Sequence, residues 1–336
     1  MITKDTINKV DSDKICDAYD KWPEIARDCY ESKIPKLDLK EMKNIIFVGM
    51  GGSGTIGDVI SSILSKTNIH VSVVKGYVLP KTVDDNTLIV IISVSGDTDE
   101  SVVVLKNAIL TNAKIITFSS GGKLEEISKN NNIPYFKISK FHSPRASFTS
   151  FLYTILGVLE DILPINKNEI EQSLKFLEEI KMKISSQNLT DTNTSLEIAK
   201  WISDIPIIYY PWGLQSVAIR FKNSLQENAK LHVITEDVIE ACHNGVVSWE
   251  KKQSVQPILI QGIDDNIKTK ERWKILEEFF KTKNIPFYRI SSLDGNIISK
   301  ITNLIYILDY ASIYHAIIHK IDPSPVNSID YIKNRV

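Results

Sequence analysis

Cysteine is scarce in this sequence. Only Cys16, Cys29 and Cys242 occur in 336 residues, and they show none of the paired spacings that mark a structural zinc site. An odd and sparse set in a chain of this length also argues against a disulfide framework. We therefore expect no metal site, and a cytoplasmic location in which these thiols stay reduced.

An excess of charge of either sign is also missing. The 40 Lys and Arg residues are balanced by 41 Asp and Glu residues, which leaves a net charge of −1. The sequence therefore lacks the global positive field that attracts nucleic acid, and we expect no nucleic-acid partner. A local anion site remains compatible with this balance, because it requires only a few backbone N–H groups and one or two cations.

Long apolar runs are absent as well. A membrane-spanning helix needs about 20 consecutive apolar residues, and the longest candidate, 304–318, is interrupted by Asp309, Ser312 and His315. The first residues lack the basic and then apolar pattern of a secretory signal peptide. These features predict no association with a membrane and favour the cytoplasm.

The sequence does contain a regular alternation of strand-like and helix-like segments. With 43% hydrophobic and 24% charged residues, its composition is that of a globular protein, and its length fits two domains of about 150 residues each. In the first half, short apolar runs alternate with helical stretches, which predicts a doubly wound sheet of parallel strands. The expected strands are 44–49, 69–74, 87–92, 113–118 and 133–138, and the expected helices are 57–65, 101–110 and 123–130.

The second half repeats this plan. Residues 1–42 have a helical character, with Pro23 and Pro35 marking breaks. We therefore predict two tandem doubly wound α/β domains, 1–155 and 156–336, with helical N-terminal and C-terminal extensions. The expected strands of the second half are 205–210, 231–235, 255–260 and 287–290, and its expected helical stretches are 151–202, 217–231, 269–282 and 299–319.

Glycines cluster after the first expected strand. Five of the 14 glycines fall in the segment 49–57, which reads Gly-Met-Gly-Gly-Ser-Gly-Thr-Ile-Gly. Glycine lets the backbone turn tightly and approach a ligand, while the N-terminus of the following helix presents unpaired N–H groups to an anion. The alternative is a dinucleotide site, because Gly49, Gly51 and Gly54 satisfy the G-x-G-x-x-G pattern. Dinucleotide sites usually have an acidic residue at the end of the next strand, but this sequence has Lys75-Gly-Tyr there.

Hydroxyl groups follow the third expected strand. Ser93, Ser95 and Thr98, together with Gly96, stand at the carboxyl end of this strand and just before a helix. Ligands bind at this edge of parallel α/β sheets, and hydroxyls with backbone amides at a helix N-terminus can hold a phosphate group without a metal. The alternative is that these residues only cap the helix. Capping by Thr98 leaves Ser93 and Ser95 unexplained, so the pattern favours phosphate binding.

Both loops resemble those of the sugar isomerase (SIS) domain, whose phosphosugar site has the pattern S-x-S-G-x-T. Other segments are similar to the bifunctional phosphoglucose/phosphomannose isomerases of that superfamily, notably A-x-R-x-K followed by E-N-A-K, and a His-Asn pair followed by a tryptophan. The family usually has glutamate after that pair and threonine in its D-P-T-P-V tail, where this sequence has Gly245 and Ser324. The resemblance covers nearly the whole chain in order and implies two SIS domains. The matching segments are 49–57, 93–98, 143–145, 218–230, 240–249 and 322–333.

The resemblance implies an enzyme of carbohydrate metabolism, acting in glycolysis and gluconeogenesis. It would interconvert fructose 6-phosphate with glucose 6-phosphate and mannose 6-phosphate through a cis-enediolate, with no cofactor, metal or nucleotide. A hydroxyl or a water held by Ser324 would help the enzyme to accept the mannose epimer. The expected hexose 6-phosphate ligands are Gly51, Gly52, Ser53, Ser93, Ser95, Thr98 and Ser324.

Four residues are expected to carry the catalysis. Glu227 matches the family's general base, which moves a proton between carbons 1 and 2, and His243 matches the histidine that opens the sugar ring. In the family this histidine reaches the active site of the neighbouring subunit, so a homodimer is implied. Arg145 is expected to place positive charge beside the enediolate or its hydroxyls. Lys333 resembles the C-terminal lysine that reaches the sugar.

A sugar-phosphate-sensing regulator built from the same domains is the alternative from another functional class. Such a protein would keep the phosphate loops, lack the base and the histidine, and carry a helix-turn-helix DNA-binding region. Glu227 and His243 favour the enzyme. Residues 1–42 are neither long nor basic enough to form a DNA-binding region.

Overall fold

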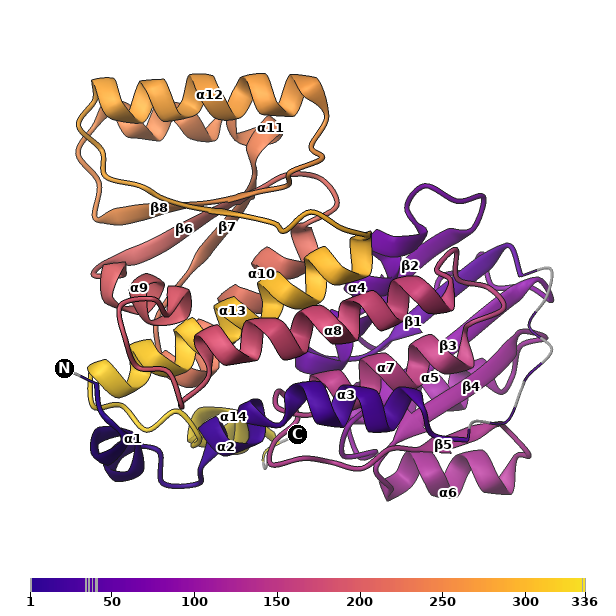
Figure 1. Ribbon diagram of the computed structural model, residues 1–336. Helices are drawn as coiled ribbons and strands as arrows, with labels where there is room; N and C mark the ends of the chain where they lie inside the picture. The colour runs from indigo at the N-terminus through magenta and orange to yellow at the C-terminus, as the bar shows by residue number, and fades with distance from the viewer. Residues whose placement is uncertain are drawn as a thin grey trace. The chain divides into compact units, whose positions relative to one another are not determined.

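The computed structural model describes residues 2–33, 35, 37, 39, 42–333 and 335. The chain divides into two compact units, whose elements are labelled in Figure 1. We call Lys21–Leu174 the sheet A unit, and Met1–Asp20 together with Lys175–Val336 the sheet B unit. These bounds differ from the expected division at residues 155 and 156.

The first helices of the chain belong to the same unit as its end. Helix α1 spans Lys4–Val10 and α2 spans Ile15–Asp20, and both contact α13 (Ile297–Ile318). On α13, the Tyr306 hydroxyl donates a hydrogen bond to the backbone oxygen of Tyr19 at 2.7 Å, and the Tyr310 hydroxyl donates to that of Cys16 at 3.2 Å. Both bonds tie α13 to the backbone of α2. They join segments almost 300 residues apart, so no local sequence pattern reveals them.

The sheet A unit is built on parallel strands in the order β2-β1-β3-β4-β5. Every residue of β3 is buried, as expected for a central strand that is covered on both faces. The doubly wound parallel fold predicted for the first half is therefore confirmed. The strands are β1 (Asn44–Val48), β2 (His70–Val74), β3 (Thr87–Ser93), β4 (Lys114–Ser119) and β5 (Tyr135–Lys137), and the helices are α3 (Trp22–Tyr30), α4 (Gly51–Leu64), α5 (Asp99–Ala108), α6 (Gly122–Asn130) and α7 (Phe148–Val158).

Helix α4 begins at Gly51, earlier than the expected start at residue 57. Gly57 therefore lies inside the helix and not in the preceding loop. A Cβ atom on Gly57 would lie 2.7 Å from the Cβ of Phe47 on β1, so glycine lets α4 pack closely on the sheet. Part of the glycine pattern thus reflects packing between helix and strand, whatever binds at the loop.

The sheet B unit has parallel strands in the order β7-β6-β8-β9. The strand expected at 231–235 lies instead at 234–237, because the chain leaves α10 through a left-handed residue, Lys230, and runs on before it pairs with β6. The stretch 151–202 comprises separate helices, with α8 beginning in one unit and continuing in the other. The strands are β6 (Ile205–Tyr210), β7 (Ile234–Asp237), β8 (Val255–Gln261) and β9 (Tyr288–Ser291), and the helices are α8 (Lys167–Ile184), α9 (Thr194–Trp201), α10 (Gln215–Ala229), α11 (Val238–Ala241), α12 (Ile267–Thr282), α13 and α14 (Asn327–Lys333), with a 3₁₀ helix at Gly245–Glu250.

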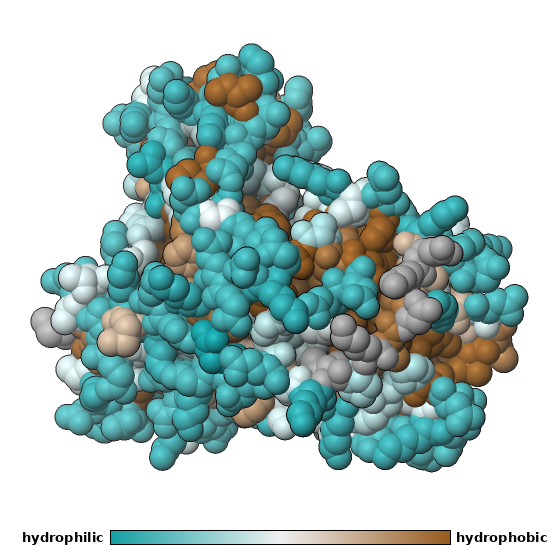
Figure 2. Space-filling model, turned by 45° about the vertical axis from the view of Figure 1, so that its right-hand side comes forward, coloured by the Kyte–Doolittle hydropathy of each residue, from teal (hydrophilic) through white to brown (hydrophobic). Residues whose placement is uncertain are grey.

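Helix α13 is long and apolar enough to cross a membrane by length and composition. Within the structure, however, 94% of its most apolar window is buried, and it contacts both α9 and α10. A helix that is hydrophobic on all sides is typical of a protein core as well as of a bilayer. Among the described residues it is the one helix that passes this test. Figure 2 shows one face of the molecule, on which hydrophilic side chains predominate.

Candidate active site

The two loops singled out in the sequence lie at the same edge of sheet A. Strands β1 and β3 are neighbours, with Val48 paired to Ile91. From β1 the chain moves to β2 on one side, and from β3 it moves to β4 on the other. Parallel α/β sheets form a ligand crevice at such a reversal of strand order. The glycine loop after β1 and the hydroxyl loop after β3 flank this point.

The hydroxyl loop, Val94–Thr98, is organised by its own side chains. The hydroxyls of Ser93 and Thr98 are hydrogen bonded at 2.8 Å, and the Ser93 hydroxyl accepts the backbone N–H of Gly96 at 3.1 Å. Thr98 occupies the N-cap position of α5, yet its hydroxyl bonds Ser93 and not the helix backbone. The alternative in which Thr98 serves as the side-chain cap is therefore contradicted. Ser95 is exposed, and its hydroxyl accepts from the N–H of Asp97 at 3.2 Å.

A third loop, at the start of α6, fixes the hydroxyl loop in place. Gly96 has φ of +80°, and a Cβ atom there would lie 1.7 Å from the backbone oxygen of Gly121. Only glycine fits this close approach. The Asp97 carboxylate accepts the N–H of Lys123 at 2.9 Å, and the N–H of Leu124 donates to the Gly96 oxygen at the same distance. No local sequence pattern indicates this role of Asp97, because its partners follow a different strand.

The glycine loop places a helix N-terminus beside the hydroxyl loop. Gly51 is the first residue of α4 and has φ of +51°, and Ser53 is buried in the first turn. Met50 is the N-cap residue, and its side chain makes no capping hydrogen bond to the first N–H groups of α4. At the end of β2, Lys75 pairs with Asp58 at 2.6 Å. A basic residue thus stands where a dinucleotide fold has its ribose-binding acid.

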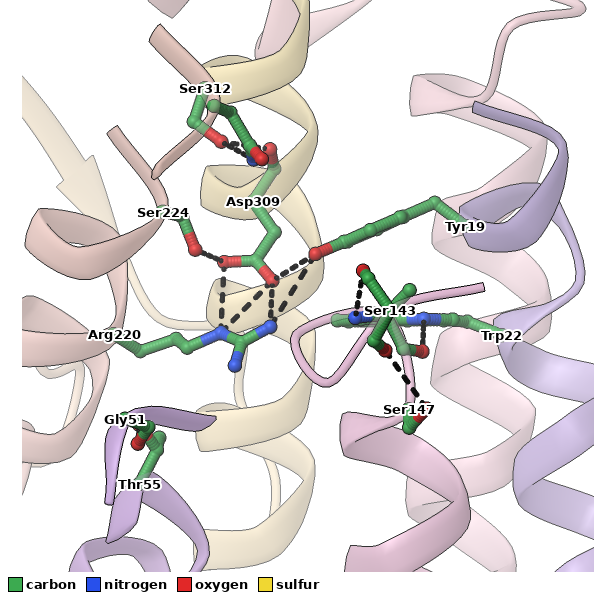
Figure 3. Close-up of polar contacts among 12 residues, drawn as sticks. Tyr19, Trp22, Gly51, Thr55, Ser143, Ser147, Arg220, Ser224, Asp309 and Ser312 are labelled. Atoms are coloured by element: carbon green, nitrogen blue, oxygen red, sulfur yellow. Dashed lines mark hydrogen bonds and ion pairs between the residues drawn. The ribbon is translucent and has the colours of Figure 1, made fainter. Parts of the chain in front are cut away.

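Arg145 lies in a tightly held turn just before α7. Only 3% of this residue is exposed. The Trp22 indole N–H donates to the backbone oxygen of Ala146 at 2.7 Å, and the Ser147 hydroxyl lies 2.9 Å from the backbone oxygen of Ser143. Figure 3 shows Trp22, Ser143 and Ser147 gathered around this turn. Arg145 therefore belongs to a tightly held turn in the unit that also carries the glycine loop and the hydroxyl loop.

Glu227 lies near the end of α10, which a buried ion pair fixes to α13. The Arg220 guanidinium donates to the Asp309 carboxylate at 2.6 Å and 3.1 Å, and both residues are buried. The hydroxyls of Ser224 and Tyr19 also donate to this carboxylate (Figure 3). Burial disfavours the charge on Arg220, but Asp309 more than offsets this effect and raises the pKa of the guanidinium. The arginine of the A-x-R-x-K motif is thus part of the core, and Glu227 is half-buried one to two turns further on.

His243 is exposed and follows α11. The Asn244 amide donates to the Glu240 carboxylate at 2.7 Å, which closes this turn. At Gly245, a Cβ atom would lie 2.3 Å from a carboxylate oxygen of Glu236. Burial, with a smaller effect of Glu240, raises the pKa of Glu236. The departure from the family at position 245 therefore has a structural counterpart, since the Glu236 carboxylate occupies the space of a side chain there.

The C-terminal tail is anchored before its last helix. Ser324 is buried and its N–H donates to the Asp322 carboxylate at 3.0 Å, while the Ser12 hydroxyl donates to the same carboxylate at 2.5 Å. Helix α14 follows, and its described side chains, Lys333 included, are exposed. The tail is thus held in place at Asp322 and Ser324, whereas the helix that follows is exposed.

The part of the chain that the structure describes contains no group of three or more His, Cys, Asp or Glu side chains placed to hold a metal ion. In the sheet A unit, the candidate groups are the hydroxyls and backbone amides of the two loops, together with Arg145. In the sheet B unit, they are Glu227, His243, Ser324 and Lys333. These groups suit an anionic ligand and acid–base chemistry.

The fold and the loops define a protein of two SIS-type α/β domains. Residues 38–140 match the SIS domain, and residues 191–336 match the bacterial phospho-glucose isomerase C-terminal SIS domain. The C-terminal domain of glucosamine-fructose-6-phosphate aminotransferase from Francisella tularensis has a similar fold, with a TM-score of 0.69, 15% identity, and coverage of 93% of this chain and 98% of that chain.

Several curated proteins are similar to this chain over most of its length. Bifunctional phosphoglucose/phosphomannose isomerases from Caldicellulosiruptor bescii and Aquifex aeolicus are 29% and 28% identical, over 94% of this chain and 96% and 94% of theirs. A D-glucosamine-6-phosphate 4-epimerase from Sulfolobus acidocaldarius is 28% identical over 72% of this chain and 76% of its own length. The chain thus carries two SIS domains, the second of the bacterial phospho-glucose isomerase type, and over most of its length it is similar to the bifunctional phosphoglucose/phosphomannose isomerases.

Proposed function

We propose that this protein is an aldose–ketose isomerase that interconverts fructose 6-phosphate with glucose 6-phosphate and mannose 6-phosphate. The observation that carries the proposal is the hydroxyl loop at the reversal of strand order in sheet A, in a chain whose relatives over 94% of its length are such isomerases. Glu227 and His243 favour this enzyme over a non-catalytic sensor of sugar phosphates.

The phosphate group is assigned to the hydroxyl and glycine loops. The exposed Ser95 hydroxyl and the first N–H groups of α4 and α5 supply donors for its oxygens, and the positive ends of both helix dipoles favour its charge. The bond between Ser93 and Thr98 and the tie from Asp97 to α6 hold these donors in place before the substrate arrives. Preorganisation of this kind reduces the entropy lost on binding.

The proton transfers are assigned to the sheet B unit. Glu227 removes the proton from carbon 2 of the aldose and returns it to carbon 1, while His243 donates a proton to the ring oxygen when the cyclic sugar opens. Arg145 stabilises the negative charge of the enediolate, and a cation fixed in a rigid turn needs no reorganisation to do so. Ser324 and Lys333 are assigned to the sugar hydroxyls.

A coupled assay tests the proposal. The purified protein is given each hexose 6-phosphate in the presence of a chelator, and formation of the other two is followed. We expect all three to interconvert. A protein that acts only on glucosamine 6-phosphate would favour the activity named for the Sulfolobus acidocaldarius relative. Binding of these sugars without turnover would favour the sensor.

Removal of two loop hydroxyls is expected to weaken binding more than turnover. The double variant Ser95→Ala with Thr98→Val should raise KM by about tenfold to a hundredfold. The Ser95 hydroxyl supplies one hydrogen bond to a charged group, worth roughly 1.5–3 kcal/mol, and loss of the Thr98 hydroxyl removes the bond that orders the loop. Turnover should change by less than about threefold, since a remote phosphate contributes similar binding to substrate and transition state.

The matched control removes two hydroxyls at the far end of α4. The Ser65 and Thr67 hydroxyls donate to helix carbonyls at 2.6 and 2.7 Å, and the Thr67 hydroxyl also accepts the N–H of Ile69 at 3.3 Å. In Ser65→Ala with Thr67→Ala, KM should stay at the wild-type value. Steady-state kinetics with fructose 6-phosphate makes the comparison. An unchanged KM in the loop variant would place the phosphate elsewhere.

We further propose a homodimer in which His243 completes the site of the partner subunit. Glu227→Gln and His243→Ala proteins should each be nearly inactive, and a mixture should regain activity after subunit exchange. An equal mixture forms heterodimers in half of its molecules, each with one native site of two, so about a quarter of wild-type activity is expected. Light scattering establishes the dimer, and labelled subunits establish exchange. Proven exchange without recovery would assign both residues to the site of a single chain.

A further inference from the structure

A lysine at the end of α10 joins the helix that carries Glu227 to the C-terminal tail. The Lys230 Nζ donates to the backbone oxygen of Glu227 at 2.6 Å and to that of Pro325 at 2.8 Å. Lys230 and Pro325 are 95 residues apart in the sequence. One ammonium group therefore bridges the last turn of the helix and the residue that follows Ser324.

The backbone at Lys230 is one in which glycine is usually found. Its φ of 56° and ψ of 32° are left-handed, and the N–H of Leu231 donates to the oxygen of Leu225 at 3.3 Å across the end of the helix. This arrangement is a left-handed helix end, in which a Cβ atom is strained and glycine is preferred. Lysine at this position brings an ammonium group, which glycine would not supply, to two backbone carbonyl groups.

The position of the bridge suggests what this ammonium group does. On its N-terminal side, the tail is tied by Asp322 to Ser12 and to its own backbone. On its C-terminal side stands α14, whose described side chains are exposed. The contact between Lys230 and Pro325 thus holds the tail just before α14 begins, next to Ser324, which is assigned to the sugar.

We propose that Lys230 is a positioning residue, whose ammonium keeps the tail that bears Ser324 and Lys333 fixed to the end of the helix that bears Glu227. The inference rests on the proposed function for the roles of these three residues, whereas the bridge is a property of the fold. Without the ammonium, Ser324, Lys333 and Glu227 remain chemically intact, but the tail is no longer bound to α10 at Pro325. Ser324 and Lys333 are then misplaced during the reaction.

The kinetic test uses variants that separate the side chain from the backbone. Lys230→Met removes the ammonium and keeps most of the stem, and it should lower kcat by about tenfold or more, because small misplacements are costly in an active site. KM should change by less than about threefold, since the phosphate loops are untouched. Lys230→Arg should restore part of the activity, because its guanidinium also donates to carbonyl groups.

Lys230→Gly distinguishes positioning from a merely structural role. Glycine relieves the left-handed strain, so the thermal midpoint should equal or exceed that of the wild type while kcat falls as in Lys230→Met. Lys320 provides the matched control, because it is also a left-handed lysine at the end of a helix, with φ of 58°. Lys320→Gly and Lys320→Met should leave kcat unchanged.

Hydrogen exchange measures the bridge without reference to activity. In Lys230→Met, the amides of Ser324 and Ile329, which donate to the Asp322 carboxylate and to the backbone oxygen of Val326, should exchange at least about tenfold faster than in the wild type, since opening of the tail no longer breaks the bond to Pro325. Lys320→Met should exchange as the wild type does. Unchanged exchange in Lys230→Met, whatever its kcat, would overturn the proposal, as would faster exchange with a wild-type kcat. A wild-type protein without isomerase activity would instead overturn the proposed function, and the exchange comparison would still decide whether the bridge holds the tail.

Discussion

Replacement of Glu227 by glutamine is expected to lower the turnover of fructose 6-phosphate by about a hundredfold or more. Glutamine keeps the shape and hydrogen bonding of glutamate but cannot accept a proton, and loss of a general base costs about 10²–10⁴-fold. Because the phosphate loops are unaffected, fructose 6-phosphate should still bind with nearly wild-type affinity. Coupled kinetics and calorimetric titration measure the two quantities separately.

The control for this variant is Glu271→Gln on α12. Glu271 is a helix glutamate paired with Lys268 at 2.9 Å, and it has no assigned part in the reaction. Its replacement should leave both turnover and binding unchanged. Turnover near the wild-type level in Glu227→Gln would show that another group moves the proton.

Replacement of Asp309 by alanine is expected to destabilise the protein by about 3–5 kcal/mol. The change leaves the Arg220 guanidinium buried without its counter-ion, which is the costly way to break a buried ion pair. The hydroxyls of Ser224 and Tyr19 also lose their acceptor. The free energy of unfolding, measured in urea, should fall by this amount for the transition that includes α10 and α13.

Two comparisons separate this effect from the loss of any ion pair. Arg220→Met with Asp309→Leu replaces both charges by apolar groups and should cost much less than Asp309→Ala alone. Glu171→Ala removes a partly exposed partner of Arg27 and should cost less than about 1 kcal/mol. A loss below about 1 kcal/mol in Asp309→Ala would mean that solvent reaches Arg220 and that the pair does not fix α10 to α13.

The sequence predicted those features that depend on local patterns. The strands of sheet A fall within a few residues of their expected positions, because buried parallel strands are short apolar runs between helices. The placement of Ser93, Ser95 and Thr98 at the carboxyl edge followed from the same pattern. The start of α4 was predicted too late, because glycine is a poor helix former and its packing against Phe47 is a long-range effect.

Features that depend on distant contacts could not be predicted. The N-terminal helices belong with the end of the chain because tyrosines of α13 bond to α2. The motif arginine, Arg220, is a core residue because Asp309 faces it from another helix. Lys230 stood in a recognised motif, but its partner, Pro325, lies 95 residues away. Each of these pairs joins residues that lie far apart in the sequence, and no periodic pattern of residue types indicates that they meet.

The most direct test of the isomerase is a proton NMR measurement of fructose 6-phosphate incubated with the protein in deuterium oxide, with a chelator present. We expect glucose 6-phosphate and mannose 6-phosphate to form with deuterium at carbon 2, because an enediolate intermediate lets the proton held by the base exchange with solvent. Absence of both aldose phosphates would contradict the proposed activity. Aldose phosphates that still carry no deuterium at carbon 2 after many turnovers would contradict the enediolate and the role of Glu227 in forming it.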